Sequence, residues 1–153
     1  MQNTFRQGRR QKTRTTELYN IASHSGTEIL CCDLPHTVSV SAVSATGVCY
    51  IGMDPFRIET TAQERVHLAH ELGHCETGSF YNVYSPLDVR EKQERRADCW
   101  AVSRLVPAEE FMDALSCGMV EVWELAEHFD VTEDFIRKAV EIYKIKNVLQ
   151  LQG

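Results

Sequence analysis

Two histidines flank a glutamate in the stretch His70-Glu71-Leu72-Gly73-His74, which lies in a segment with the pattern of a helix. On a helix, positions i and i+4 share one face, so both imidazoles could bind one metal ion. Glu71 would then stand beside that metal, where a general base for a water molecule belongs. The bland alternative is a helix that carries two solvated histidines.

A third ligand must come from elsewhere, because catalytic zinc commonly takes three protein ligands and one water. A second helix is predicted from residue 87 or 88 to 106, and Glu94 and Asp98 share the apolar face that is formed by Ala97, Trp100, Ala101 and Leu105. A carboxylate among core positions is costly unless it is paired or binds a metal. Glu94 is therefore the best candidate ligand. Asp98 could accept the free ring N–H of a ligand histidine. The alternative is a pair of surface acids.

Other side chains compete for the same metal. His67 lies seven residues before His74 and therefore near the same helix face. Glu91 is an acid one turn before Glu94 but lies away from the centre of the apolar stripe. Cys75 and Cys99 each directly follow a candidate residue, and a thiolate is a good zinc ligand. These alternatives stay open at this point.

Such a site would hydrolyse an amide bond. A bound metal lowers the pKa of a water and polarises the scissile carbonyl, and Glu71 can pass the proton of the water to the leaving amine. Zinc is the default ion for two histidines and a glutamate, although manganese or iron could take the same ligands. Tyr81 and Tyr84 could donate to the oxyanion, but ordinary packing or exposure is the simpler expectation for both.

The elements that must position these residues are a small sheet followed by helices. A helix is predicted at 15–25 and strands at 28–34, 38–43 and 48–53, which form an antiparallel sheet with hairpin connections. Thr61 and Glu64 predict a capping box at the start of the motif helix, and Gly78 its end. A loop follows from residue 79. Further helices are predicted at 108–117, 120–128 and from Thr132 onward. The fold class is α+β, and an extended substrate could pair with the free edge of the sheet.

Bulk composition is that of one ordinary domain. The chain has 153 residues, of which 43% are hydrophobic and 25% charged. No apolar run approaches a membrane span and the N-terminus has no apolar signal core, so we expect a cytoplasmic protein. The six cysteines include no Cys-x-x-Cys pair and are expected to be free thiols.

Charge is concentrated at the N-terminus. Residues 1–16 hold five of the 16 basic side chains and none of the 22 acidic ones. This arm could contact nucleic acid, but it has few large apolar residues, and a disordered extension is the preferred interpretation.

The combined pattern resembles the ImmA/IrrE family of small metallopeptidases. The resemblance rests on the His-Glu-Leu-Gly-His motif, on Glu94-Arg-Arg-Ala-Asp98-Cys-Trp-Ala101 and on Leu105-Val-Pro107. It implies a zincin-like core with His70, His74 and Glu94 as metal ligands and Glu71 as the base. It also implies a substrate, namely a cognate helix-turn-helix repressor that is cut to relieve repression. Family members often have a second acid at the position of Arg96.

We expect three parts in the chain: the basic arm at 1–16, which is not part of the resemblance, a catalytic domain at 17–107 and a C-terminal helical subdomain at 108–153. The last of these has the apolar spacing of a helix-turn-helix, so a DNA-binding or protein-binding regulator with a structural metal and no turnover is the alternative function. Against DNA binding, Glu133, Asp134 and Glu141 would repel phosphates, and Asp130 occupies the turn where glycine is usual. No direct contact with nucleic acid or membrane is expected.

Overall fold

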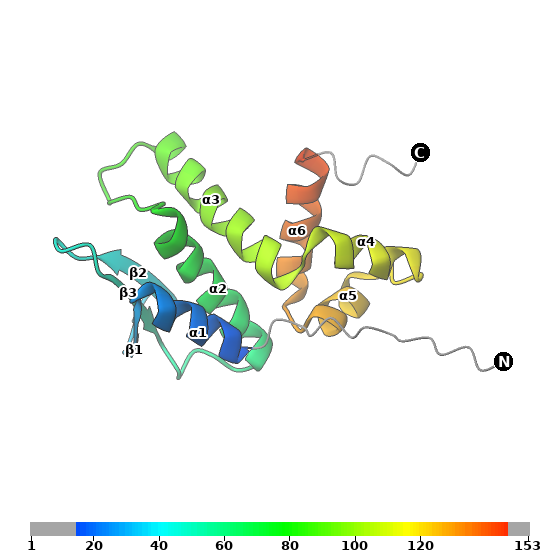
Figure 1. The fold of residues 1–153 in the computed structure, drawn as a ribbon, viewed down its shortest axis with the longest axis horizontal. Helices are drawn as coiled ribbons and strands as arrows, with labels where there is room; N and C mark the ends of the chain where they lie inside the picture. Colours follow the sequence, from blue (N-terminus) through cyan, green and yellow to red (C-terminus); the bar gives the residue numbers. More distant parts are fainter. Residues whose placement is uncertain (1–14, 147–153) are drawn as a thin grey trace.

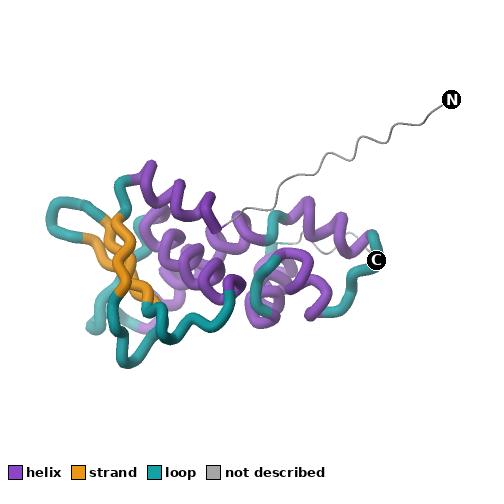
Figure 2. Tube along the Cα trace, turned by 90° about the horizontal axis from the view of Figure 1, so that it is seen from below, coloured by secondary structure: helices purple, strands orange, loops and turns teal. Residues whose placement is uncertain are grey.

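A computed structural model describes residues 15–146 and shows an α+β architecture. A three-stranded sheet lies at one end, and a group of short helices lies at the other (Figures 1 and 2). The elements in chain order are α1 (Thr15–Ser25), β1 (Glu28–Cys31), β2 (Ser39–Val43), β3 (Cys49–Met53), α2 (Thr61–Thr77), α3 (Leu87–Leu105), α4 (Ala108–Ser116), α5 (Val122–Phe129) and α6 (Glu133–Ile145).

The sheet is mixed, so the prediction of a purely antiparallel sheet is wrong for its first strand. The strand order is β1-β3-β2, with β2 antiparallel and β1 parallel to β3. The chain between β1 and β2 crosses the end of β3 at Asp54. There Leu34 N donates to Asp54 Oδ2 at 3.0 Å, and Asp54 N donates to Val38 O at 2.9 Å. The buried Asp54 side chain thus accepts a hydrogen bond from a backbone N–H of the crossing loop. A hairpin between β1 and β2 would have no such crossing loop.

Helix α2 carries the His-Glu-x-x-His motif and packs between the sheet, α1 and α3. Its N-cap is Thr60, whose hydroxyl accepts from Gln63 N at 3.1 Å, so the capping residue lies one position before the predicted one. The helix ends as predicted at Gly78, which has the left-handed φ of 63°.

The C-terminal helices share one hydrophobic core with the rest of the described chain. Buried side chains form a continuous cluster from Leu18 of α1 through Leu72 of α2 to Ile136 of α6. At the turn before α6, Asp130 adopts a φ of 54°, the left-handed conformation that favours glycine. Its carbonyl accepts a hydrogen bond of 2.9 Å from Nε of the buried Arg65 of α2. This bond anchors the turn on the motif helix.

Two cysteines are not free thiols, which corrects the expectation for the whole set. Cys49, at the start of β3, forms a disulfide with Cys75 of α2, and their Cα atoms lie 5.9 Å apart. Cys31, Cys32, Cys99 and Cys117 are free. The prediction of free thiols is wrong for this pair because the fold places the first residue of β3 beside the end of α2. The positions of the two cysteines in the sequence do not reveal this contact.

Most of the basic arm at 1–16 lies outside the described residues; only Thr15 and Thr16 belong to α1. Within residues 15–146, no helix combines the length and the apolar composition that crossing a membrane requires.

Candidate metal centre

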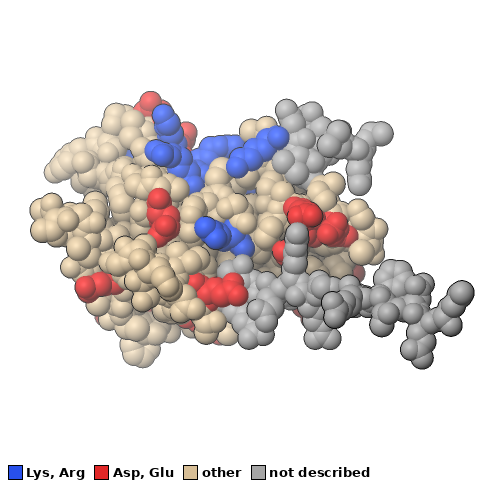
Figure 3. Space-filling model, viewed as in Figure 1, with Lys and Arg blue, Asp and Glu red and all other residues tan. Residues whose placement is uncertain are grey.

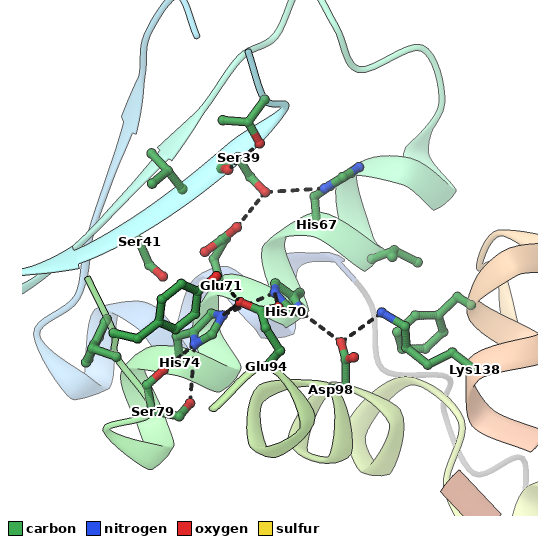
Figure 4. A pocket seen from close by; sticks show the side chains of 16 residues that line it. Ser39, Ser41, His67, His70, Glu71, His74, Ser79, Glu94, Asp98 and Lys138 are labelled. Atoms are coloured by element: carbon green, nitrogen blue, oxygen red, sulfur yellow. Dashed lines mark hydrogen bonds and ion pairs between the residues drawn. The ribbon is translucent and has the colours of Figure 1, made fainter. Parts of the chain in front are cut away.

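Helices α2 and α3 bring together the two motif histidines and the acid that was predicted as third ligand. The ring nitrogen His70 Nε2 lies 3.2 Å from His74 Nε2 and 3.1 Å from Glu94 Oε2. His74 Nε2 lies 3.3 Å from Glu94 Oε1. Among residues 15–146, these three side chains form the group whose ligand atoms could hold a metal ion (Figure 4).

The donor set fits a small tetrahedral cation. Zinc ligands at about 2.0–2.1 Å define a tetrahedron whose edges are about 3.3 Å long, and the distances between these three ligand groups are close to that value. Two imidazole nitrogens and a carboxylate are also ligands that zinc commonly takes. His70 and His74 therefore present the atoms that such an ion requires.

The second ring nitrogen of His70 is held from α3. His70 Nδ1 lies 2.8 Å from Asp98 Oδ1, and Lys138 Nζ of α6 donates to the same oxygen at 2.9 Å. An imidazole that donates through Nδ1 leaves its Nε2 lone pair for a metal. Asp98 thus contacts the free ring nitrogen of a candidate ligand histidine, which is the contact that the sequence predicted. Lys138 balances the negative charge of Asp98.

The second ring nitrogen of His74 is held by the chain that follows α2. His74 Nδ1 lies 2.5 Å from the carbonyl oxygen of Ser79, which is buried. Gly78 reverses the chain in the left-handed conformation and so returns Ser79 to the helix end. With both Nδ1 atoms donating, the two Nε2 lone pairs and the Glu94 oxygens point at one another, an arrangement that needs a cation between them.

The pKa values of His70, Glu94 and Asp98 are shifted by the same close contacts. Burial alone would lower the pKa of His70, but the hydrogen bonds to Asp98 and Glu94 outweigh it and raise the pKa to about 9. Hydrogen bonds from His70 and His74 hold the pKa of Glu94 well below its usual range, against the opposing effect of burial. Burial also opposes ionisation of Asp98, but His70 and Lys138 lower its pKa.

Glu71 lies in the same cleft, which has a volume of about 590 Å³ and is bounded by β2, α2, α3 and α6. Its side chain is buried and points toward the sheet, where Oε1 accepts a hydrogen bond of 2.7 Å from Ser39 Oγ (Figure 4). A carboxylate next to the ligand group can take a proton from a water in the cleft.

The structure separates the competing candidates from the centre. His67 lies in the cleft, but its Nδ1 is 3.3 Å from Ser39 Oγ, and within the described chain it is not in the ligand group. Cys75 is bonded to Cys49, which overturns its role as an alternative ligand. Glu91 is exposed, and Cys99 packs against the hydrophobic core; neither joins the ligand group of residues 15–146.

One tyrosine reaches the site. Tyr81 OH donates to Glu94 Oε1 at 2.6 Å, and this bond, with burial, raises the pKa of Tyr81 to about 12. Tyr84 is 92% exposed. Tyr84 is thus ordinarily exposed, as expected, whereas Tyr81 contacts a candidate ligand.

Sequence reasoning missed Ser39, Ser79 and Lys138. The alternation of residues 38–43 predicts that Ser39 and Ser41 lie on the same face of a strand. The sequence does not indicate that this face contacts α2. Ser79 acts through its carbonyl, which any residue supplies. Lys138 comes from a helix that is remote in sequence and shows no pattern that distinguishes it from a surface lysine.

An α+β fold in which two helices bring together two histidines and an acid, with a glutamate in the same cleft, defines a candidate metal centre. Residues 59–141, more than half of the chain, match the family model described as the IrrE N-terminal-like domain, Peptidase_M78. The chain belongs to this family of ImmA/IrrE-type metallopeptidases. Comparisons with curated proteins and with solved structures found no match.

Proposed function

We propose that this protein is a zinc-dependent endopeptidase with a zincin-like core. The observation that carries the proposal is the convergence of His70 Nε2, His74 Nε2 and Glu94 within 4.8 Å, with Glu71 in the same cleft. Family membership supports the same activity. When bound, zinc supplies the Lewis acidity that lowers the pKa of a water and polarises the scissile carbonyl.

In this proposal the side chains of the site have separate roles in metal binding and proton transfer. His70, His74 and Glu94 would hold the metal, and Asp98 fixes the tautomer of His70. Glu71 accepts the proton of the attacking water and donates it to the leaving amine as the C–N bond breaks. Tyr81 lies close enough to Glu94 to reach the cleft.

The substrate in this proposal is an extended polypeptide. Strand β2 is at the outer edge of the sheet order, and Val40 and Ser41 line the cleft, so a peptide strand can pair with it beside Glu71. Beyond the centre, a groove between α3 and α6 shares Glu94, Asp98 and Lys138 with the cleft. Lys and Arg side chains gather over this region of the surface (Figure 3).

The family resemblance leads us to propose a helix-turn-helix repressor as the protein substrate. In this view residues 17–107 form the catalytic domain and residues 108–153 the C-terminal helical subdomain, of which 147–153 lie outside the described residues. Its described helices hold Lys138 at the site and dock the repressor. We place the reaction in the cytoplasm, where such a repressor acts, and expect no direct contact with nucleic acid.

The test compares the zinc-loaded chain with a Glu71→Gln variant. Each is co-expressed with the helix-turn-helix repressors encoded in the same genome, and repressor length is read by immunoblot and mass spectrometry. We expect the wild-type chain to shorten one repressor and Glu71→Gln to bind equal zinc but cleave at least about a hundredfold more slowly. Equal effects of both chains on a repressor that stays intact would favour a regulator with a structural metal.

A further inference from the structure

The carboxylate of Glu71 is oriented by a residue of the sheet. Ser39 Oγ donates to Glu71 Oε1 at 2.7 Å across 32 residues of sequence, and both side chains are buried. Ser39 is the first residue of β2, whose pairing with Met53 of β3 fixes its backbone. The general base of the proposed reaction is thus held from the side opposite α3 (Figure 4).

His67 lies behind the hydroxyl of Ser39, with Nδ1 3.3 Å from Oγ. A serine hydroxyl carries one proton, and an ionised carboxylate only accepts. Because the proton of Ser39 goes to Glu71, His67 must donate through Nδ1 for the second bond to form. The result is a directed series from His67 N–H to Ser39 O–H to Glu71 Oε1. Each bond in such a series polarises the next.

The bond from Ser39 uses one acceptor position of Oε1, and the lone pairs of Oε2 stay available to accept a proton. A free glutamate on a helix rotates about three side-chain bonds, whereas a general base must hold its carboxylate within hydrogen-bond reach of the water. The bond from Ser39 selects one orientation and occupies the oxygen that faces the sheet. It therefore acts on the geometry of proton transfer and leaves the ligand atoms of α2 and α3 untouched.

We propose that Ser39, supported by His67, is a positioning residue for the general base Glu71. The proposal rests on the peptidase function proposed above. It also assigns a role to His67, which adjoins the motif but lies outside the ligand group of the described residues. A purely structural Ser39 would affect stability and leave the turnover number unchanged.

The first measurement reads the tautomer of His67 in the full-length, zinc-loaded chain by two-bond proton–nitrogen correlation spectroscopy of the histidine rings. A His67→Gln variant assigns the signal among the six histidines. We expect the Nδ1–H tautomer in the wild type, in Ser39→Thr and in Ser41→Ala, which changes the same strand. Ser39→Ala should lose it. An Nε2–H tautomer in the wild type, or an unchanged spectrum in Ser39→Ala, would overturn the proposal.

The second measurement uses the best-cleaved member of a library of internally quenched random peptides. We expect Ser39→Ala to lower kcat by roughly tenfold or more, a part of the contribution of a general base, with unchanged KM and zinc content. Ser39→Thr should recover most of the rate because it keeps the hydroxyl. Equal kcat for Ser39→Ala and an active wild type would overturn the positioning role alone. A zinc-loaded wild type that cleaves neither peptides nor repressor would overturn the proposed function and this role with it.

Discussion

Gly73 of α2 lies directly against the backbone of Ala97 of α3. A Cβ at residue 73 would lie 2.5 Å from the carbonyl oxygen of Ala97 and 2.9 Å from its Cα. Gly73 stands between the two motif histidines, and Ala97 stands between Glu94 and Asp98. The two helices are therefore in backbone contact at the level of the candidate metal centre, where a side chain would force them apart.

Gly73→Ala should destabilise the protein by about 1–3 kcal/mol, the usual range for overpacking, and should weaken zinc binding because it separates α2 from α3. Thermal unfolding with and without zinc measures both effects. Glu76→Ala, at an exposed position of the same helix, is the matched control and should be nearly neutral. A variant with wild-type stability and zinc affinity would contradict the tight contact.

Glu94→Ala should remove one of three ligands and reduce bound zinc to a small fraction of one ion per chain after dialysis. Elemental mass spectrometry of protein purified under reducing conditions measures the content. Glu91→Ala, which removes an exposed acid one turn earlier on α3, should retain the metal. If both variants kept a full equivalent, the third ligand would lie elsewhere.

Asp98→Ala should lower zinc affinity by about 10- to 100-fold, because the Nδ1 of His70 would lose the acceptor that fixes its tautomer. Competition with a chromophoric chelator gives the affinity. Asp88→Ala, which removes an exposed acid in the first turn of the same helix, controls for net charge. Equal zinc affinity in the two variants would show that Asp98 does not support His70 as a ligand and acts only as an ion-pair partner of Lys138.

Zinc affinity should rise with pH until about pH 9. In the metal-free protein the pKa of His70 is raised from 6.5 to about 9, so the ring is protonated below that pH and must lose a proton before it binds zinc. Apparent affinity should therefore increase by roughly tenfold per pH unit, and flatten above the raised pKa. Chelator competition at several pH values tests this. A plateau that begins near pH 6.5 would show an ordinary histidine.

Cys49→Ser should destabilise the oxidised protein by about 3 kcal/mol, since the disulfide closes a loop across a sequence separation of 26. Unfolding in denaturant, with and without a reductant, measures the effect. Reductant should lower the stability of the wild type to that of the variant and should not change the variant. Cys117→Ser, at an exposed free thiol, should behave as the wild type does. A wild type insensitive to reductant would contradict the crosslink.

The helices that carry the site were predictable because their signals are local. The i, i+4 spacing of His70 and His74 and the apolar face that includes Ala97 both follow from helical periodicity. The same reasoning placed Glu94 and Asp98 on the inward face, where the structure puts them beside His70.

Contacts between remote segments were not predictable in this way. The parallel pairing of β1 depends on a loop that Asp54 satisfies, and the Cys49–Cys75 bond depends on how β3 meets α2. Lys138 reaches Asp98 only because the core places α6 against α3. Tertiary packing creates each of these contacts, and no local pattern encodes it.

The matched family segment begins at residue 59, and Ser39 precedes it. Every candidate ligand atom and the Glu71 carboxylate are thus encoded in one stretch of chain, while the hydroxyl that orients the carboxylate is encoded in another. The residues that would bind the ion and the residue that orients the general base therefore lie in separate parts of the sequence. A helix pair separated from its sheet would keep the candidate ligand atoms but would lose the hydroxyl that orients the carboxylate of Glu71.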